Sequence, residues 1–179
     1  MGLTHPIALL ALTAEGGRLA RQIQTTFPGS EVYGLTGRVT DCDIPFTQTG
    51  DTVIDLFQAG RPIVAICAAG ILIRILGPHL ADKQTEPAIL AVSSDGASIV
   101  PLLGGHHGAN RLATDIARAT GGTAAITTAG DVIHGIALDD PPPGWTVANP
   151  EMAKPVMADL LDGKHACLVI EAGEPDWLS

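Results

Sequence analysis

Two adjacent histidines lie within a glycine-rich stretch near the middle of the chain. The run GGHHGAN, residues 104–110, follows an apolar segment and leads directly into a helical pattern. Glycine lets a backbone approach a ligand closely, the start of a helix attracts carboxylate or phosphate groups, and imidazoles transfer protons near neutral pH. We interpret this run as a candidate site for acid–base chemistry on an anionic substrate. The alternative is a turn that only packs a capped helix. The candidates are Gly104, Gly105, His106, His107, Gly108 and Asn110.

The side chains of this run differ in the chemical roles that they can have. Adjacent side chains diverge, so only one of His106 and His107 can face a cleft. A metal site is not expected, because only His79 and His134 could complete it and their spacing does not support that role. Asn110 stands where an N-cap residue would, and capping explains it as well as ligand contact does.

Two cations and a group of polar residues are further candidates. Arg74 and Lys83 flank an apolar turn, where they either pair with Asp82 or Glu86 or bind an anionic ligand. The segment 127–131 supplies hydroxyls and a carboxylate at the end of an apolar run, and an ordinary turn explains it equally well. The candidates in that segment are Thr127, Thr128 and Asp131.

Apolar runs of strand length alternate with helical patterns along the chain. This order predicts an α/β fold with an open, mostly parallel sheet and helices on both faces, a Rossmann-like three-layer arrangement with one hairpin arm. Ligands in such sheets bind beyond the carboxyl ends of the strands, so we expect the loops 67–74, 104–110 and 127–131 to converge there. The predicted strands are 6–12, 32–35, 63–67, 88–92, 98–102 (the hairpin arm), 124–128 and 166–170, and the predicted helices are 18–26, 51–59, 71–76, 110–120 and 150–161.

Composition and missing motifs argue against several classes of function. The 179 residues predict one domain over residues 1–170 and an acidic tail or truncated linker over residues 171–179. A net charge of −9 argues against a nucleic-acid surface, and no run is long enough for a membrane span. Cys42, Cys67 and Cys167 lack metal-ligand spacing and are interpreted as buried small hydrophobes in a cytoplasmic protein. Dinucleotide, phosphate-loop and serine-elbow motifs are missing, which disfavours a nucleotide-binding domain and a serine hydrolase.

Four blocks of sequence, taken together, resemble the N-terminal region of the cobalamin biosynthesis protein CbiG. They extend from Ala68 to Asp131 in matching order and spacing. The family's glycine block reads G-H-x-G-G-A-N, whereas residues 105–110 have one glycine fewer. The blocks are AAGILIR (68–74), GPHLADK with EPA (77–88), LLGGHHGANRLA (102–113) and ITTAGD (126–131).

The resemblance implies a role in cobalamin biosynthesis, namely hydrolysis of the δ-lactone of cobalt-precorrin-5A with loss of acetaldehyde. It would make His106 or His107 the acid or base, the glycine amides a cradle for the oxyanion, and Arg74 and Lys83 the partners of substrate carboxylates. No cofactor is implied. The alternative is a corrinoid-binding accessory domain without activity. The implied partners are a corrin-ring intermediate and either a CbiG C-terminal-type domain or a precorrin methyltransferase.

Overall fold

The computed structural model describes residues 5–83, 85–105, 108–128, 138, 141, 144–173 and 178. The chain forms two compact units, Leu3–Ala125 and one that contains Ile126–Ser179. A compact unit is not by itself a domain that folds independently. The predicted domain over residues 1–170 and the tail over 171–179 therefore stay predictions.

A seven-stranded sheet organises the first unit, with strand order β3-β2-β1-β4-β5-β6-β7. The predicted α/β fold, with its mostly parallel open sheet, is confirmed. The elements of this unit are β1 (Ala8–Ala11), α1 (Ala14–Thr26), β2 (Glu31–Leu35), β3 (Ile44–Phe46), α2 (Thr49–Gln58), β4 (Ile63–Ile66), α3 (Ala69–Leu76), the 3-10 turn η1 (Gly77–His79), β5 (Ile89–Val92), β6 (Ser98–Leu103), α4 (Ala109–Thr120) and β7 (Thr123–Ala124).

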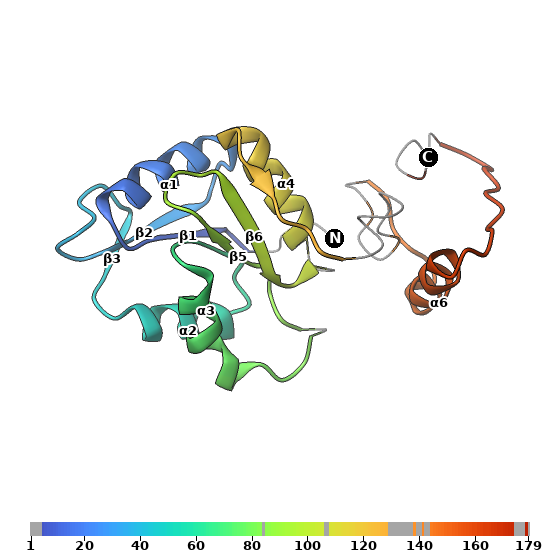
Figure 1. Cartoon of the computed structure of the whole chain (residues 1–179), viewed down its shortest axis with the longest axis horizontal. Helices are drawn as coiled ribbons and strands as arrows, with labels where there is room; N and C mark the ends of the chain where they lie inside the picture. Colours follow the sequence, from blue (N-terminus) through green and yellow to red (C-terminus); the bar gives the residue numbers. More distant parts are fainter. Residues whose placement is uncertain are drawn as a thin grey trace. The chain divides into compact units, whose positions relative to one another are not determined.

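Helices cover both faces of this sheet, with α1 and α4 on one side and α2 and α3 on the other (Figure 1). Successive residues of a strand point to opposite faces. Leu9 and Ala11 of β1 belong to the core that includes residues of α1 and α4. Ala8 and Leu10 belong to the core of α2 and α3. All four are completely buried, which explains why the parallel strands are apolar without alternation.

Strands β1 to β5 run parallel to one another, and β6 reverses. In the antiparallel pair of β5 and β6, Val92 lies opposite Ile99 and Ile89 lies opposite Leu103. The end of β6 therefore lies beside the start of β5. We call the side of the sheet where β1, β4 and β5 end its carboxyl end. The opposite side, where these three strands begin, is its amino end. Because β6 is antiparallel, it ends at the amino end.

Several predicted boundaries differ from the structure. Helix α1 begins at Ala14, because Thr13 caps it through a bond from the amide of Gly16 at 3.1 Å. A Cβ on Gly17, in the first turn of that helix, would lie 2.8 Å from Cγ1 of Val39, so the glycine leaves room for that side chain. Strand β3 was not predicted; its three residues are too few to show a period. The strand predicted at 124–128 is reduced to β7.

The second unit contains helix α6 (Pro150–Leu161), whose predicted bounds are confirmed. The strand predicted at 166–170 is wrong, because these residues form no strand and are exposed. Val169 has 74% of its surface exposed. Apolar character alone cannot distinguish a buried strand from an exposed segment of the same composition.

One substitution made at two positions tests this difference in burial. Val64→Ala removes two methyl groups from a completely buried site in β4, so we expect it to lower the free energy of unfolding by about 2 kcal/mol. Val169→Ala, at an exposed site, should change it by less than about 0.5 kcal/mol. Urea denaturation of both variants measures the two values. Equal losses would contradict the exposed placement of Val169.

Candidate functional site

The glycine-rich loop joins the end of β6 to the start of α4 at the amino end of the sheet. Gly104 has a positive φ of 71°, and a Cβ on it would lie 2.6 Å from the carbonyl oxygen of Pro87. Its own carbonyl accepts a hydrogen bond from the amide of Ala109 at 3.0 Å. The loop therefore lies directly against the segment that enters β5. Two of the four blocks that carry the resemblance are in contact here, because one contains Pro87 and the other contains Gly104.

The start of α4 differs from the sequence prediction for Asn110. The N-cap residue is Gly108, with φ at +87°, so the capping interpretation of Asn110 is wrong. Asn110 lies inside the first turn, and 8% of its surface is exposed. It is a buried polar side chain beside the glycine loop, and its backbone carbonyl accepts a bond from the Thr114 hydroxyl at 3.0 Å.

The two predicted cations do not lie together. Arg74 is in the last turn of α3, and its Nη1 donates to the carbonyl of Gly70 in the same helix at 2.8 Å. Its guanidinium is thus directed back along α3. Lys83 is exposed in the segment between η1 and β5. Within the described part of the chain neither forms an ion pair, so of the two alternatives for these cations, pairing with Asp82 or Glu86 is not found.

The remaining predicted residues cannot be assembled into this site. Thr127 and Thr128 are described without regular secondary structure and belong to the second compact unit. His106, His107 and Asp131 lie outside the described residues. Their proposed roles stay predictions.

The expected convergence of three loops is wrong for two of them. The segment 67–70 follows β4 at the carboxyl end, whereas residues 104–110 follow β6 at the amino end. The reason is the hairpin itself, because an antiparallel return strand delivers its loop to the opposite end of the sheet. The third loop, 127–131, begins in the other unit.

An apolar hollow of about 180 Å³ lies next to the glycine loop. It is enclosed by α3, η1, β5 and β6, and Leu103, which precedes Gly104, lines it. Two large apolar side chains in its wall are exposed, Ile73 at 59% and Leu80 at 43%. Exposed apolar side chains around a hollow are typical of a surface that binds an apolar ligand face.

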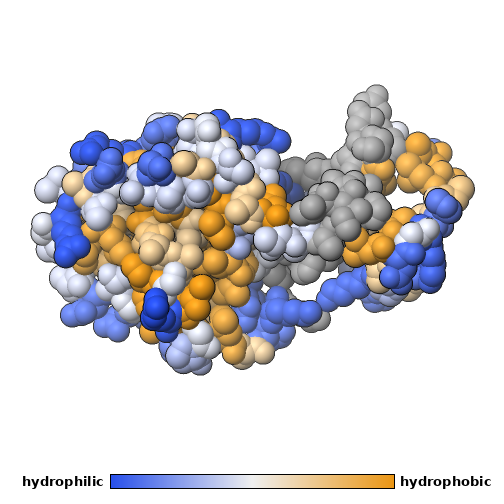
Figure 2. All heavy atoms as spheres, in the orientation of Figure 1, coloured by the Kyte–Doolittle hydropathy of each residue, from blue (hydrophilic) through white to orange (hydrophobic). Residues whose placement is uncertain are grey.

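A larger cavity, of about 470 Å³, lies at the carboxyl end of the sheet. Its lining comes from the segments that follow β1, β4 and β5, together with Arg38 and the start of β6. In Figure 2 hydrophobic atoms gather between α1 and α3, the two helices whose N-terminal ends border this cavity. Sequence reasoning missed Arg38, Ser94 and Ser98, although their positions near strand ends could have indicated them.

Cys67 lines the same cavity and is half-buried. Burial raises the pKa of its thiol to about 11, because a thiolate there would lose hydration. Cys42 is also half-buried, but Cys167 is exposed, so the prediction of burial is wrong for Cys167. The described residues contain no group of three or more metal-ligating side chains, and no helix among them is long and apolar enough to cross a membrane.

Replacing Gly104 tests the contact between the loop and Pro87. Gly60 is a matched control, with φ at +68° and no atom within 4 Å of the position that a Cβ would occupy. Gly60→Ala should cost about 1–2 kcal/mol of unfolding free energy, from the left-handed backbone alone. Gly104→Ala should cost about 3 kcal/mol or more, since it also overlaps backbone atoms. Thermal and urea unfolding give both values, and equal losses would contradict the close approach.

Alkylation of Cys67 tests its environment. In a chain whose other two cysteines are replaced by serine, the iodoacetamide rate should keep rising up to about pH 11, because the thiolate is the nucleophile. A chain that retains only the exposed Cys167 should react faster at pH 8. A Cys67 rate that levels off near an ordinary thiol pKa, about 8.5, would contradict the burial of the thiol.

Comparison with known proteins shows which family the sequence resembles. Residues 51–131 match the family model described as cobalamin synthesis G N-terminal. A cobalt-precorrin-5A hydrolase from Priestia megaterium is 30% identical over 179 residues, which is 95% of this chain and 48% of the relative. A second one, from Salmonella typhimurium, is 34% identical over 139 residues, or 74% of this chain and 38% of the relative. The chain therefore spans about half, or less, of the length of these relatives.

A solved structure agrees on the fold. A cobalamin biosynthesis protein G homologue from Sulfolobus solfataricus superimposes with a TM-score of 0.53 at 18% identity, covering 97% of this chain and 52% of the other. The family match and the relatives confirm the resemblance that the four blocks suggest. The chain thus carries, at residues 51–131, a domain of the cobalamin synthesis G N-terminal family.

Proposed function

We propose that this chain acts in cobalamin biosynthesis, in the hydrolysis of the δ-lactone of cobalt-precorrin-5A. The observation that carries the proposal is its similarity, over 95% of its length, to a curated cobalt-precorrin-5A hydrolase. The chain spans 48% of that relative, so we further propose a CbiG C-terminal-type domain as its partner. We assign the reaction to the cytoplasm, where free cysteines such as those of this chain remain reduced.

The amino end of the sheet supports substrate binding in three ways. The apolar hollow with exposed Ile73 and Leu80 offers a surface for one face of a macrocycle. Lys83 lies exposed on the segment between η1 and β5, which contacts the glycine loop at Pro87, and there it can meet a peripheral carboxylate. The left-handed Gly104 and Gly108 let that loop's backbone approach a ligand without side chains between them.

The chemistry needs a base for water and donors for an oxyanion. In our proposal His106, or else His107, removes a proton from water, which adds to the lactone carbonyl carbon. The amides of Gly104, Gly105 and Gly108, together with the start of α4, stabilise the negative oxygen. The C–O bond of the lactone then breaks, which leaves a carboxylic acid on the macrocycle and an alkoxide on the two-carbon fragment. As the alkoxide becomes the carbonyl of acetaldehyde, the carbon–carbon bond between the fragment and the macrocycle breaks. The electron pair of that bond stays with the macrocycle, which takes up the proton held by the imidazole.

The other predicted residues complete this proposal. Arg74 is proposed to bind a second peripheral carboxylate after its guanidinium leaves the Gly70 carbonyl. Asn110 would support the loop from the first turn of α4. Thr127, Thr128 and Asp131 would contribute polar contacts from the following segment.

A binding function without hydrolysis is the second candidate. One observation favours it: residues 105–110 have one glycine fewer than the family's block, so the loop is shorter than in the pattern. In that case the domain would hold a corrin intermediate for a precorrin methyltransferase.

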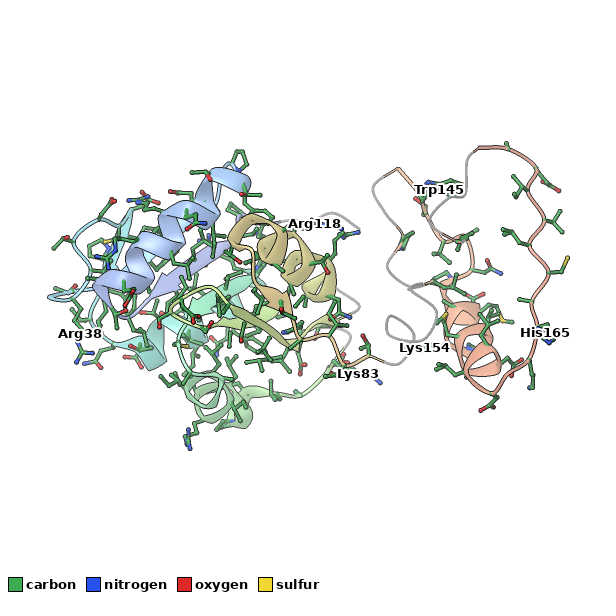
Figure 3. The ribbon with its side chains drawn as sticks, turned by 45° about the horizontal axis from the view of Figure 1, so that its top comes forward. Arg38, Lys83, Arg118, Trp145, Lys154 and His165 are labelled. Carbon is green, nitrogen blue, oxygen red and sulfur yellow. The ribbon has the colours of Figure 1, made fainter. Side chains whose placement is uncertain are left out.

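Acetaldehyde release separates these two functions. The whole chain, alone and together with a CbiG C-terminal-type domain, is given cobalt-precorrin-5A and the product is measured. Our proposal expects release that falls about 10²–10⁴-fold in His106→Ala, the usual contribution of a general base. His165→Ala, in the exposed segment after α6 (Figure 3), should leave the rate unchanged. Tight substrate binding with no release under either condition would contradict hydrolysis and favour the second candidate.

A further inference from the structure

The carboxyl end of the sheet has the topology of a ligand site. From β1 the chain passes through α1 to β2 on one side, and from β4 it passes through α3 to β5 on the other. The connections thus diverge between β1 and β4, which are neighbours. In open α/β sheets this switch point leaves a crevice at the carboxyl ends of the strands, and ligands bind there. The 470 Å³ cavity lies at this position and is within the size range of small-molecule sites, about 300–1,000 Å³.

The rim of the cavity supplies a positive charge that none of the described residues neutralises. Arg38 lines the cavity, is exposed, and has no ion-pair or hydrogen-bond partner for its side chain within the described residues. Figure 3 shows Arg38 and Lys83 at opposite ends of the Leu3–Ala125 unit, so Arg38 is separate from the proposed lactone site. An unpaired guanidinium beside a cavity is suited to a carboxylate, which it can bind through two hydrogen bonds.

Some polar groups around the cavity already have hydrogen-bond partners, and others are available to a ligand. The Ser93 hydroxyl donates to Asp95 at 2.5 Å and accepts from the amide of Ser98 at 2.9 Å. Asp95 also accepts from the Ala97 amide at 3.0 Å, so its negative charge is held within the turn. The hydroxyls of Ser94 and Ser98, by contrast, have no hydrogen-bond partner among the described residues.

The first turn of α3 adds backbone donors. Its N-cap is Ala68, which provides no side-chain bond, and alanine is among the poorest N-cap residues. Both Ala68 and Ala69 line the cavity. Helix α1, which begins at the same cavity, is capped in the ordinary way by Thr13. The first turn of α3, whose amides have no side-chain cap, therefore borders a cavity that Arg38 also lines, and it favours a negative group.

The rest of the wall is apolar. Leu12, Ile66, Ile71 and Val100 form much of the lining. No phosphate-binding glycine motif follows β1, so the chemistry favours a carboxylate on an apolar body over a phosphate. We propose that this cavity is a second ligand site, distinct from the glycine loop, that binds a small molecule with a carboxylate group and an apolar body. The carboxylate belongs either to a free acid or to a side arm of the corrin precursor.

Benzoate is the probe for this site, titrated into the whole ¹⁵N-labelled chain while amide shifts are followed. The expected result is that the amides of Ala69, Gly70 and Ser94 move, while those of Gly105 and Ala109 do not. Arg38→Ala should weaken benzoate binding at least fivefold, and Arg38→Lys should restore most of it. Arg118→Ala removes the same charge from the exposed surface of α4, where it pairs with Asp115, and should have no effect.

The outcomes of this titration test the proposal and identify the source of the carboxylate. No shifts at the carboxyl end, or shifts that do not depend on residue 38, would overturn the proposal. A corrin polycarboxylate that displaces benzoate from Ala69 and Gly70 identifies a side arm of the precursor, and one that leaves those shifts unchanged identifies a separate acid. The result is independent of lactone hydrolysis, because acetaldehyde release depends on the opposite end of the sheet.

Discussion

The antiparallel pairing of β5 with β6 determines where chemistry can occur in this chain. Without it, every loop after a strand would open at the carboxyl end, as in a fully parallel sheet. Because Ile89 lies opposite Leu103, the glycine loop opens at the amino end and contacts the entry to β5. The contact leaves no room for a Cβ on Gly104. The reversal thus fixes both the position of the loop and its residue type.

This arrangement gives one sheet two surfaces with different chemistry. The amino end combines a tight glycine loop with an apolar hollow, which suits a large ring that needs backbone donors at one point. The carboxyl end has a larger cavity, a guanidinium that no described residue pairs with and a helix start without a side-chain cap, which suit a smaller carboxylate. The same parallel core supports both ends. Its strands are buried on both faces, so a ligand can reach the sheet only at the ends of the strands.

Sequence reasoning predicted the elements well where long-range packing and local pattern agree. Helix α4 was predicted within one residue, since its apolar period and its glycine C-cap both point to the same bounds. Strand 166–170 failed, because Val169 is apolar but has no partner surface among the described residues. The prediction of the site failed for a different reason. A hairpin was predicted at 88–102, but its consequence for loop 104–110 was not followed. Arg38 was missed although it follows a predicted strand by three residues, because only the fold shows that it lines a cavity.

Paramagnetic broadening can measure which loops share an end of the sheet. A nitroxide attached through Ser94→Cys, with the native cysteines replaced, broadens nearby amide signals. Ser94 and Ala69 line one cavity, whereas β6 has six residues and separates its two ends by about 20 Å. We predict strong broadening at Ala69 and Gly70 and little at Gly105 and Ala109. Equal broadening at both loops would contradict the assignment of the glycine loop to the amino end.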